Sequence, residues 1–171
     1  MSFVAFYIGL DTHLGAMLEK HGLSRLLMRE VALPAFLAPL AVATLIPRWG
    51  AHRVASAGLA VTALGLALSA AAGGDHIRLL LGASVIFVAG VGISVPGLIA
   101  RVASVADPAV RGLAMSFYTF VLFIGASLGP WLAGQGAAWS EKTFFLMLSG
   151  CICIAALYSA IQGQSANTRT A

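Results

Sequence analysis

One long stretch without charge constrains the fold of this chain more than any other feature. Between Arg111 and Glu141 no side chain carries a formal charge, and most residues from 112 to 140 are apolar. A helix needs about 20 apolar residues to cross the roughly 30 Å hydrocarbon core of a bilayer. The stretch is long enough to span a membrane, and we expect the neighbouring helices to pack against it.

The same stretch carries an ordered set of small residues. Gly125 and Gly129 form a G-x-x-x-G pair, which places two bare patches of backbone on one helical face and favours close helix packing. Pro130 follows directly and removes one backbone hydrogen bond, as is common where membrane helices bend. The pattern therefore predicts a spanning helix that packs closely and bends.

Charged residues are too scarce to coat a water-facing surface. They make up 9% of the chain, against about 25% in soluble domains, and the mean hydropathy is +0.94. The predicted fold class is therefore all-α, a polytopic bundle of membrane helices. The net charge of +4 comes from lysines and arginines that lie mainly between apolar runs, where such residues anchor loops to headgroups. We expect the lipid bilayer as a partner and no nucleic acid.

Six apolar segments follow one another along the chain, joined by short polar connections. They cover residues 3–18, 31–47, 54–74, 79–100, 111–135 and 143–162. The first is short for a full crossing, so it is either a half-length helix or the end of a helix whose beginning is missing. We predict one membrane domain over residues 1–163 and a polar, disordered tail over 164–171.

Charge alone does not orient this topology. Short connections make neighbouring helices antiparallel, which divides the lysines and arginines between two sides. One side holds Arg48, Arg53, Arg101, Arg111 and Arg169, and the other holds Lys20, Arg25, Arg29, Arg78 and Lys142. With five on each side, the excess of basic residues that marks cytoplasmic loops is absent.

Two stretches resemble the C-terminal half of a major facilitator superfamily transporter. Residues 43–54, ATLIPRWGAHRV, are similar to the second copy of the family's cytoplasmic loop motif: Arg48 and Gly50 match, and Arg53 lies in its basic end. Pro47 stands where the motif has an aspartate. Residues 107–134 resemble the family's eleventh helix and the loop before it, most closely in efflux-type members, with Arg-Gly at the start and G-x-x-x-G-P in the middle.

The resemblance implies half of a transporter. A complete member has twelve helices in two pseudo-symmetric halves, with the substrate site between them near the membrane midplane. This chain would hold helices seven to twelve, the first one truncated, with the basic loops at 48–53 and 101–111 facing the cytoplasm of a cell inner membrane. The implied function is alternating-access transport of a small molecule, with proton-coupled efflux as one mode. The implied partner is an N-terminal half or a second copy.

Asp11 is the one carboxylate inside a predicted span, and an ionisable group there suggests a functional site. It would bind substrate or carry a proton, with His13 beside it and Tyr118 and Trp131 as further candidates for substrate contact. Alternatively, Asp11 and His13 lie in water or headgroups near the extracellular end, which the short segment and the nearby Glu19 favour.

Two further groups of residues are assigned from their positions. Residues of the basic loops that either form gate ion pairs or only anchor headgroups are Arg48, Gly50, Arg53, Arg101, Asp107 and Arg111. Residues that either let helices bend during transport or serve only for close packing are Gly90, Gly92, Pro96, Gly97, Gly125, Gly129 and Pro130.

No catalytic or metal-binding pattern is present in the sequence. The four histidines are dispersed, and G-x-S-x-G, H-E-x-x-H, C-x-x-C and P-loop motifs are absent, so we expect no enzyme, metal or cofactor. Cys151 and Cys153 are interpreted as buried free thiols. The alternative to a transporter is a non-transporting membrane scaffold that holds its partners through the G-x-x-x-G face.

Overall fold

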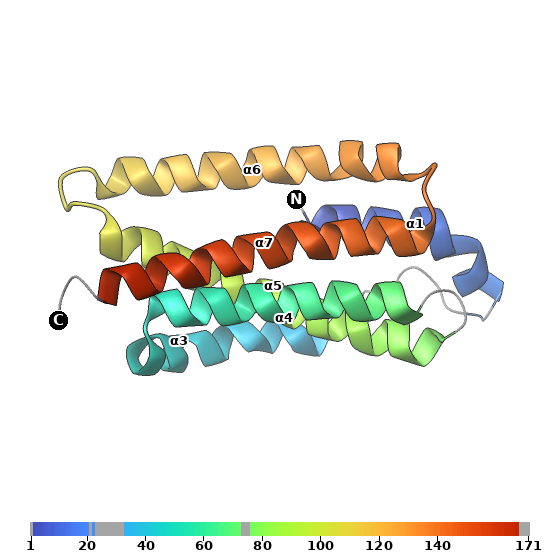
Figure 1. Cartoon of the computed structure of the whole chain (residues 1–171), viewed down its shortest axis with the longest axis horizontal. Coiled ribbons are helices and arrows are strands. Elements are labelled where there is room, and N and C mark those ends of the chain that lie inside the picture. Colours follow the sequence, from blue (N-terminus) through green and yellow to red (C-terminus); the bar gives the residue numbers. More distant parts are fainter. Residues whose placement is uncertain (1, 21, 23–32, 73–75, 168–171) are drawn as a thin grey trace.

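The computed structural model describes residues 2–20, 22, 33–72 and 76–167, apart from the side chains of residues 2, 13–20, 34, 36, 41, 43 and 162–167. Its elements are α1 (Ser2–Lys20), the 3₁₀ helix η1 (Leu33–Leu37), α3 (Ala38–Trp49), α4 (Ala51–Ala72), α5 (Ile77–Val105), α6 (Arg111–Gly136) and α7 (Glu141–Asn167) (Figure 1). The predicted all-α class is confirmed. α4, α5, α6 and α7 are long and apolar enough to cross a membrane, while the apolar part of α1, Phe3–Thr12, is shorter.

The connections at one end of the bundle are tighter than predicted. α3 and α4 are separated by Gly50 alone, whose φ of 81° suits a residue without a Cβ, and the Gly50 N–H donates to the Ile46 carbonyl (2.9 Å). Arg48 and Arg53 therefore lie in helices rather than in a loop. Arg101 also lies in a helix, because α5 continues past the predicted end at residue 100 to Val105.

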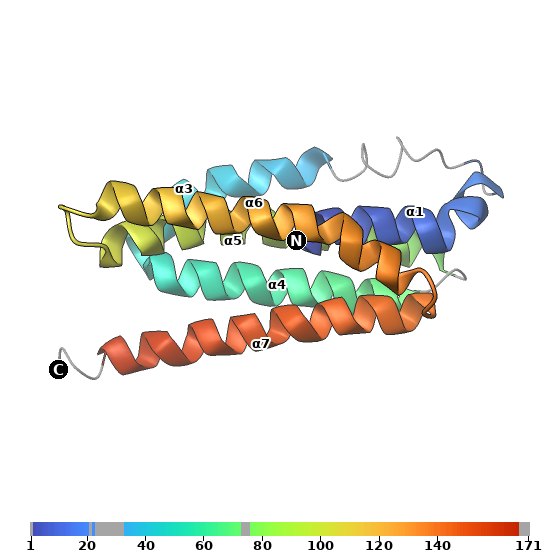
Figure 2. The same cartoon turned by 90° about the horizontal axis from the view of Figure 1, so that it is seen from above.

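α4 and α5 form the centre of the bundle. α7 packs along α4, while η1 and α3 pack along α5 (Figures 1 and 2). Seen from above, α3 and α7 lie on opposite sides of the molecule, with α4 between them (Figure 2). α1 contacts both α6 and α7.

Four glycines bring α4 and α5 into backbone contact, and we call this set the glycine seam: Gly58, Gly65, Gly90 and Gly97. A Cβ added at Gly58 would lie 2.5 Å from the backbone nitrogen of Ser94, and one at Gly65 would lie 2.6 Å from that of Phe87. At Gly90 an added Cβ would overlap Thr62. Bare glycine backbone therefore permits the close approach of the two helices.

Aromatic rings pack α1 and α7 onto α5 at Phe87, whose backbone faces Gly65 in the seam. Phe6 of α1 lies with its ring centroid 4.4 Å from that of Phe87 and 5.6 Å from that of Phe145. The neighbouring Phe144 is wedged between α1 and α6, because a Cβ at either Gly9 or Gly136 would overlap its ring. The start of α7 is thus inserted between two other helices.

The expectation that the other helices pack around residues 111–135 is wrong. Only 6% of the most apolar window of α6 is buried, against 50% in α4. α6 lies at the edge of the bundle, where it packs along α1 and touches α5 (Figure 1). Gly129 is buried and Gly125 is half-buried, but Phe117, Phe120 and Phe123 are each more than 60% exposed. Burial is confined to the second half of α6, where α1 lies alongside it (Figure 1).

The outer face of α7 also differs from the prediction. Cys151 and Cys153 are free thiols but are exposed rather than buried, since the helix packs on α4 through its other side. α7 ends at Asn167, so the predicted domain boundary at 163 falls within the helix, and residues 168–171 lie outside the described part.

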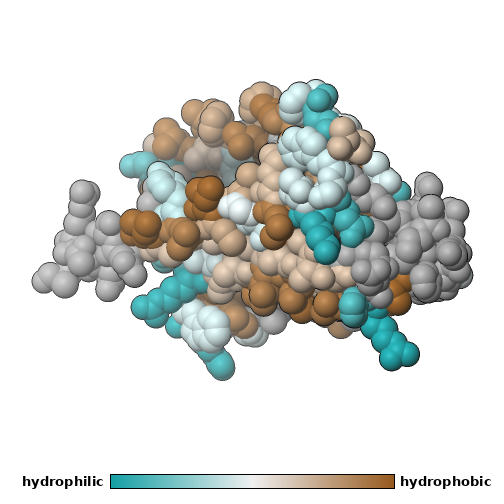
Figure 3. All heavy atoms as spheres, turned by 45° about the vertical axis from the view of Figure 1, so that its right-hand side comes forward, coloured by the Kyte–Doolittle hydropathy of each residue, from teal (hydrophilic) through white to brown (hydrophobic). Residues whose placement is uncertain are grey.

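The surface of the molecule is largely apolar. Apolar residues cover much of the face seen in Figure 3, as expected for a surface in contact with lipid.

Candidate functional site

The predicted substrate residues lie in two helices, α1 and α6. Asp11 is half-buried in α1, and the side chain of His13 lies outside the described part. Tyr118 is half-buried in α6, whereas Trp131 is 61% exposed. Thirteen residues separate these two aromatic side chains, a rise of roughly 20 Å along a helix. The structure therefore does not bring Tyr118 and Trp131 together.

The predicted gate residues gather at one end of the bundle. Arg48, Arg53 and Arg111 are exposed there. The Asp107 carboxylate accepts a hydrogen bond from the Ala109 N–H (2.9 Å), within its own turn, and no arginine of the described part shares it. In this structure, then, Asp107 stabilises the α5–α6 turn.

The residues predicted to allow bending have separate surroundings. Gly90 and Gly97 belong to the glycine seam, and Gly92 faces Pro39 of α3, with an added Cβ 3.1 Å from the proline ring. α5 is helical from Ile77 to Val105 with Pro96 inside it, and α6 is likewise helical through Pro130. The close-packing alternative therefore accounts for Gly90 and Gly97.

A cluster of polar side chains joins three helices, and of its members the sequence analysis singled out Arg101 alone. We call this cluster the polar clamp: His52, Ser56, Arg101 and Ser159. Nη1 of Arg101 in α5 donates to Oγ of Ser159 in α7 (2.9 Å). That Oγ lies 3.1 Å from Oγ of Ser56 in α4. The clamp thus ties α4, α5 and α7 together at the end of the bundle where Arg48 and Arg111 lie.

His52 extends the polar clamp toward the α3–α4 turn. Its imidazole lies near the backbone carbonyl of Ala160 in α7. Its Nδ1 is buried and has no hydrogen-bond partner within the described residues. Farther along α7, Oγ of Ser149 donates to the Ala63 carbonyl of α4 (2.9 Å) in a buried contact. Polar contacts therefore hold α7 to α4 at two levels.

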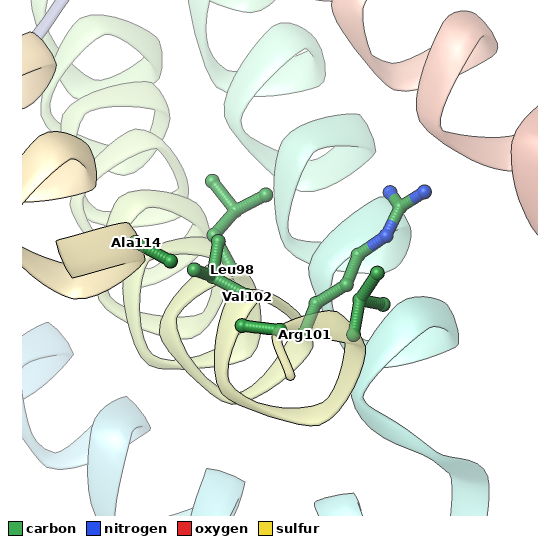
Figure 4. Close-up of a pocket in the computed structure, with 6 residues that line it drawn as sticks. Leu98, Arg101, Val102 and Ala114 are labelled. Carbon is green, nitrogen blue, oxygen red and sulfur yellow. The ribbon is translucent and has the colours of Figure 1, made fainter. Parts of the chain in front are cut away.

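A second feature of this end is an apolar cleft of about 490 Å³ between α5 and α6, which we call the α5–α6 cleft (Figure 4). Its lining residues are Leu98, Arg101, Val102, Val105, Ala106 and Ala114. Figure 4 shows the Arg101 guanidinium directed away from Ala114, toward α4 and α7. The sequence contained a signal for this surface, since Leu98, Val102 and Val105 recur at helical spacing. The predicted helix ended at residue 100, however, so Val102 and Val105 were assigned to a loop.

Charge is distributed unequally between the two ends of the bundle. At the end with the polar clamp, the described charged residues are Arg48, Arg53, Arg101, Asp107 and Arg111, an excess of three positive charges. At the opposite end they are Arg78, Glu141 and Lys142, an excess of one. The described structure is therefore more basic at the end with the polar clamp.

Comparison with known families places the chain in a recognised family. A family model described as Major Facilitator Superfamily matches residues 2–164, a range that includes α1 and most of α7. Comparison with curated proteins gave no match, and neither did comparison with solved structures.

Proposed function

The chain belongs to the major facilitator superfamily, a family of membrane transporters, and we propose that it acts as one six-helix half of a small-molecule transporter. The family and the apolar helices make it an integral, multi-pass membrane protein. We further propose that it resides in the cell inner membrane and exports its substrate in exchange for protons. The substrate would bind between this unit and a counterpart six-helix unit, near the membrane midplane.

The exposure of α6 is the observation that carries this proposal. A helix inside a bundle buries one stripe against its neighbours and leaves the rest to lipid. The first half of α6 buries no residue: Leu113, Phe117 and Phe120 are all more than 60% exposed, and the nearest buried position is Gly129. A counterpart unit packed on this half would supply the missing contacts.

Asp11 supports the proton-coupled form of the proposal. It is a half-buried carboxylate in α1, next to the buried Leu10 and one turn beyond Tyr7, within an otherwise apolar stretch. An ionisable group in such a position is costly and is commonly part of an ion or substrate pathway. In the proposed transporter Asp11 takes up a proton on one side of the membrane and releases it on the other.

The scaffold alternative loses its specific surface. That function requires the G-x-x-x-G face of α6 to be available to partners. Gly129 is instead buried within this chain, and Ala133 and Gly136 farther along the same helix are buried too. The small residues of α6 thus serve packing inside the unit, which favours the transporter.

The experiment separates the isolated chain from its paired form. In a chain whose exposed native thiols are replaced by Cys151→Ser and Cys153→Ser, Phe120→Cys on α6 and Leu157→Cys on α7 are matched, because both side chains are more than 60% exposed. In membranes that contain the counterpart, we expect the cysteine at 120 and not the one at 157 to cross-link to a second six-helix unit. Proteoliposomes with the paired form should then exchange protons for a solute of a small-molecule panel, and Asp11→Asn should abolish the proton flux.

Two results would contradict the proposal. Saturable transport by the isolated, monomeric chain would show that no counterpart is needed. Absence of proton-coupled flux from the paired form before cross-linking, over the whole solute panel, would show that the pair is not a proton-coupled transporter.

A further inference from the structure

The α5–α6 cleft has apolar walls in a region where the bundle meets lipid. Leu98 and Val102 line it from α5, Val105 lies at the end of that helix, and Ala114 lines it from α6. Both helices are long and apolar enough to cross the membrane, and the space of about 490 Å³ lies where α5 ends and α6 begins. Walls of this kind suit an acyl chain better than a polar solute.

A positive charge lies at the headgroup end of the cleft. Arg111 begins α6 one turn before Ala114, and residues three apart share a helical face. Arg111 is exposed, and the first turn of α6 contains no acidic residue. A cationic side chain therefore lies at the level of the α5–α6 turn, next to apolar walls that continue toward the membrane interior.

We propose that the α5–α6 cleft binds an anionic phospholipid, with an acyl chain against Leu98, Val102 and Ala114 and the phosphate group beside Arg111. Charge complementarity selects this occupant, because this end of the bundle carries the excess of three positive charges within the described residues. Basic pockets between membrane helices bind anionic headgroups in this way. Asp107 is the one acid of the described residues at this end, and it opposes binding. The lipid site does not depend on the proposed transport function.

Native mass spectrometry of the purified full chain with added phosphatidylglycerol or phosphatidylcholine tests the charge. We expect phosphatidylglycerol to bind more tightly, and Arg111→Gln to weaken its binding about fivefold, as expected for the loss of one arginine near an anionic lipid. The matched control is Arg78→Gln, an exposed arginine at the start of α5 and at the opposite end, which should change nothing. Asp107→Asn should strengthen the binding of phosphatidylglycerol.

Filling the cleft tests the acyl chain. Ala114→Phe places a large ring in the α5–α6 cleft and should displace the lipid, whereas Leu113→Phe, at a neighbouring position that is 73% exposed, should leave it bound. The proposal is overturned if the two phospholipids bind equally, or if Arg78→Gln weakens binding as much as Arg111→Gln. It is also overturned if Ala114→Phe has no effect, or if it abolishes a dimer of the chain instead of a lipid complex, since the occupant would then be a second copy.

Discussion

Two glycine-rich regions of this molecule differ in how much of the surrounding helix is buried. In the glycine seam, each glycine faces the backbone of the other helix: Gly58, Gly65, Gly90 and Gly97. The backbones of α4 and α5 are therefore closer together than a Cβ at these positions would allow. α6 has as prominent a small-residue pattern, yet it lies at the edge of the bundle with 6% of its most apolar window buried. Glycine in an apolar helix is thus compatible with a closed contact and with an exposed edge.

The difference shows which contacts determine the fold of the unit. Where two helices both carry small residues at matching heights, the backbones meet and the pair becomes the centre to which α3 and α7 add. In α6 the small residues accommodate a side chain of a third helix instead, as the Phe144 ring lies between Gly136 of α6 and Gly9 of α1. The rest of α6 remains available to lipid or to a partner.

The largest effect is expected from a side chain added inside the seam. Gly90→Leu would overlap Thr62 of α4, and we expect it to lower the free energy of unfolding by about 3 kcal/mol or to prevent folding. The matched control is Gly82→Leu on the same helix, where an added Cβ meets nothing within 4 Å and the change should stay within about 0.5 kcal/mol. Unfolding by SDS titration measures both, and equal losses would contradict the seam.

The contact that secures the edge helix should have the next largest effect. Phe144→Ala removes the ring held between Gly9 and Gly136, and we expect the free energy of unfolding to fall by about 2 kcal/mol. This is below the value for a water-soluble core, because the bilayer removes part of the hydrophobic term. Phe117→Ala on α6 is the control, since its side chain is 66% exposed and its loss should be nearly neutral. If both substitutions destabilise the chain equally, α6 is more tightly packed than its exposure indicates.

The smallest effect is expected from a single hydrogen bond between α7 and α4. Ser149→Ala removes the bond to the Ala63 carbonyl and should lower the free energy of unfolding by about 0.6 kcal/mol, a typical value for such bonds in membranes. Ser116→Ala, at an exposed position of α6, should have no measurable effect. The same SDS titration compares the two, and a larger loss for Ser116→Ala would reverse the assignment of packed and exposed regions.

Much of the architecture could be predicted from the sequence, because membrane helices are defined by length and apolarity. Each predicted segment contains or overlaps a helix of the structure, within the described residues. The centre of the bundle could not be predicted from one helix, since Gly125 and Gly129 indicate a packing face without indicating the partner. The better signal was paired: Ala55, Gly58, Thr62 and Gly65 recur at helical spacing in α4, with Gly90, Ser94 and Gly97 in α5.

The candidate site was harder to predict than the fold. Arg101 was assigned to a loop because charge usually ends an apolar span, but α5 continues for another turn and places Arg101 between α4 and α7, where it donates to Ser159. The serines of the polar clamp are separated by about a hundred residues, so their proximity depends on how α4 and α7 pack. A single sequence contains no direct record of that packing.

Cysteine accessibility tests the contrast between seam and edge most directly. In a chain whose exposed native thiols are replaced by Cys151→Ser and Cys153→Ser, Ser94→Cys places a thiol against Gly58 in the seam, and Leu113→Cys places one at an exposed position near the start of α6. We predict that a membrane-permeant maleimide labels the cysteine at 113 in the folded protein and labels the one at 94 only after unfolding. Equal labelling rates at the two positions in the folded protein would contradict the closed seam and the exposed edge.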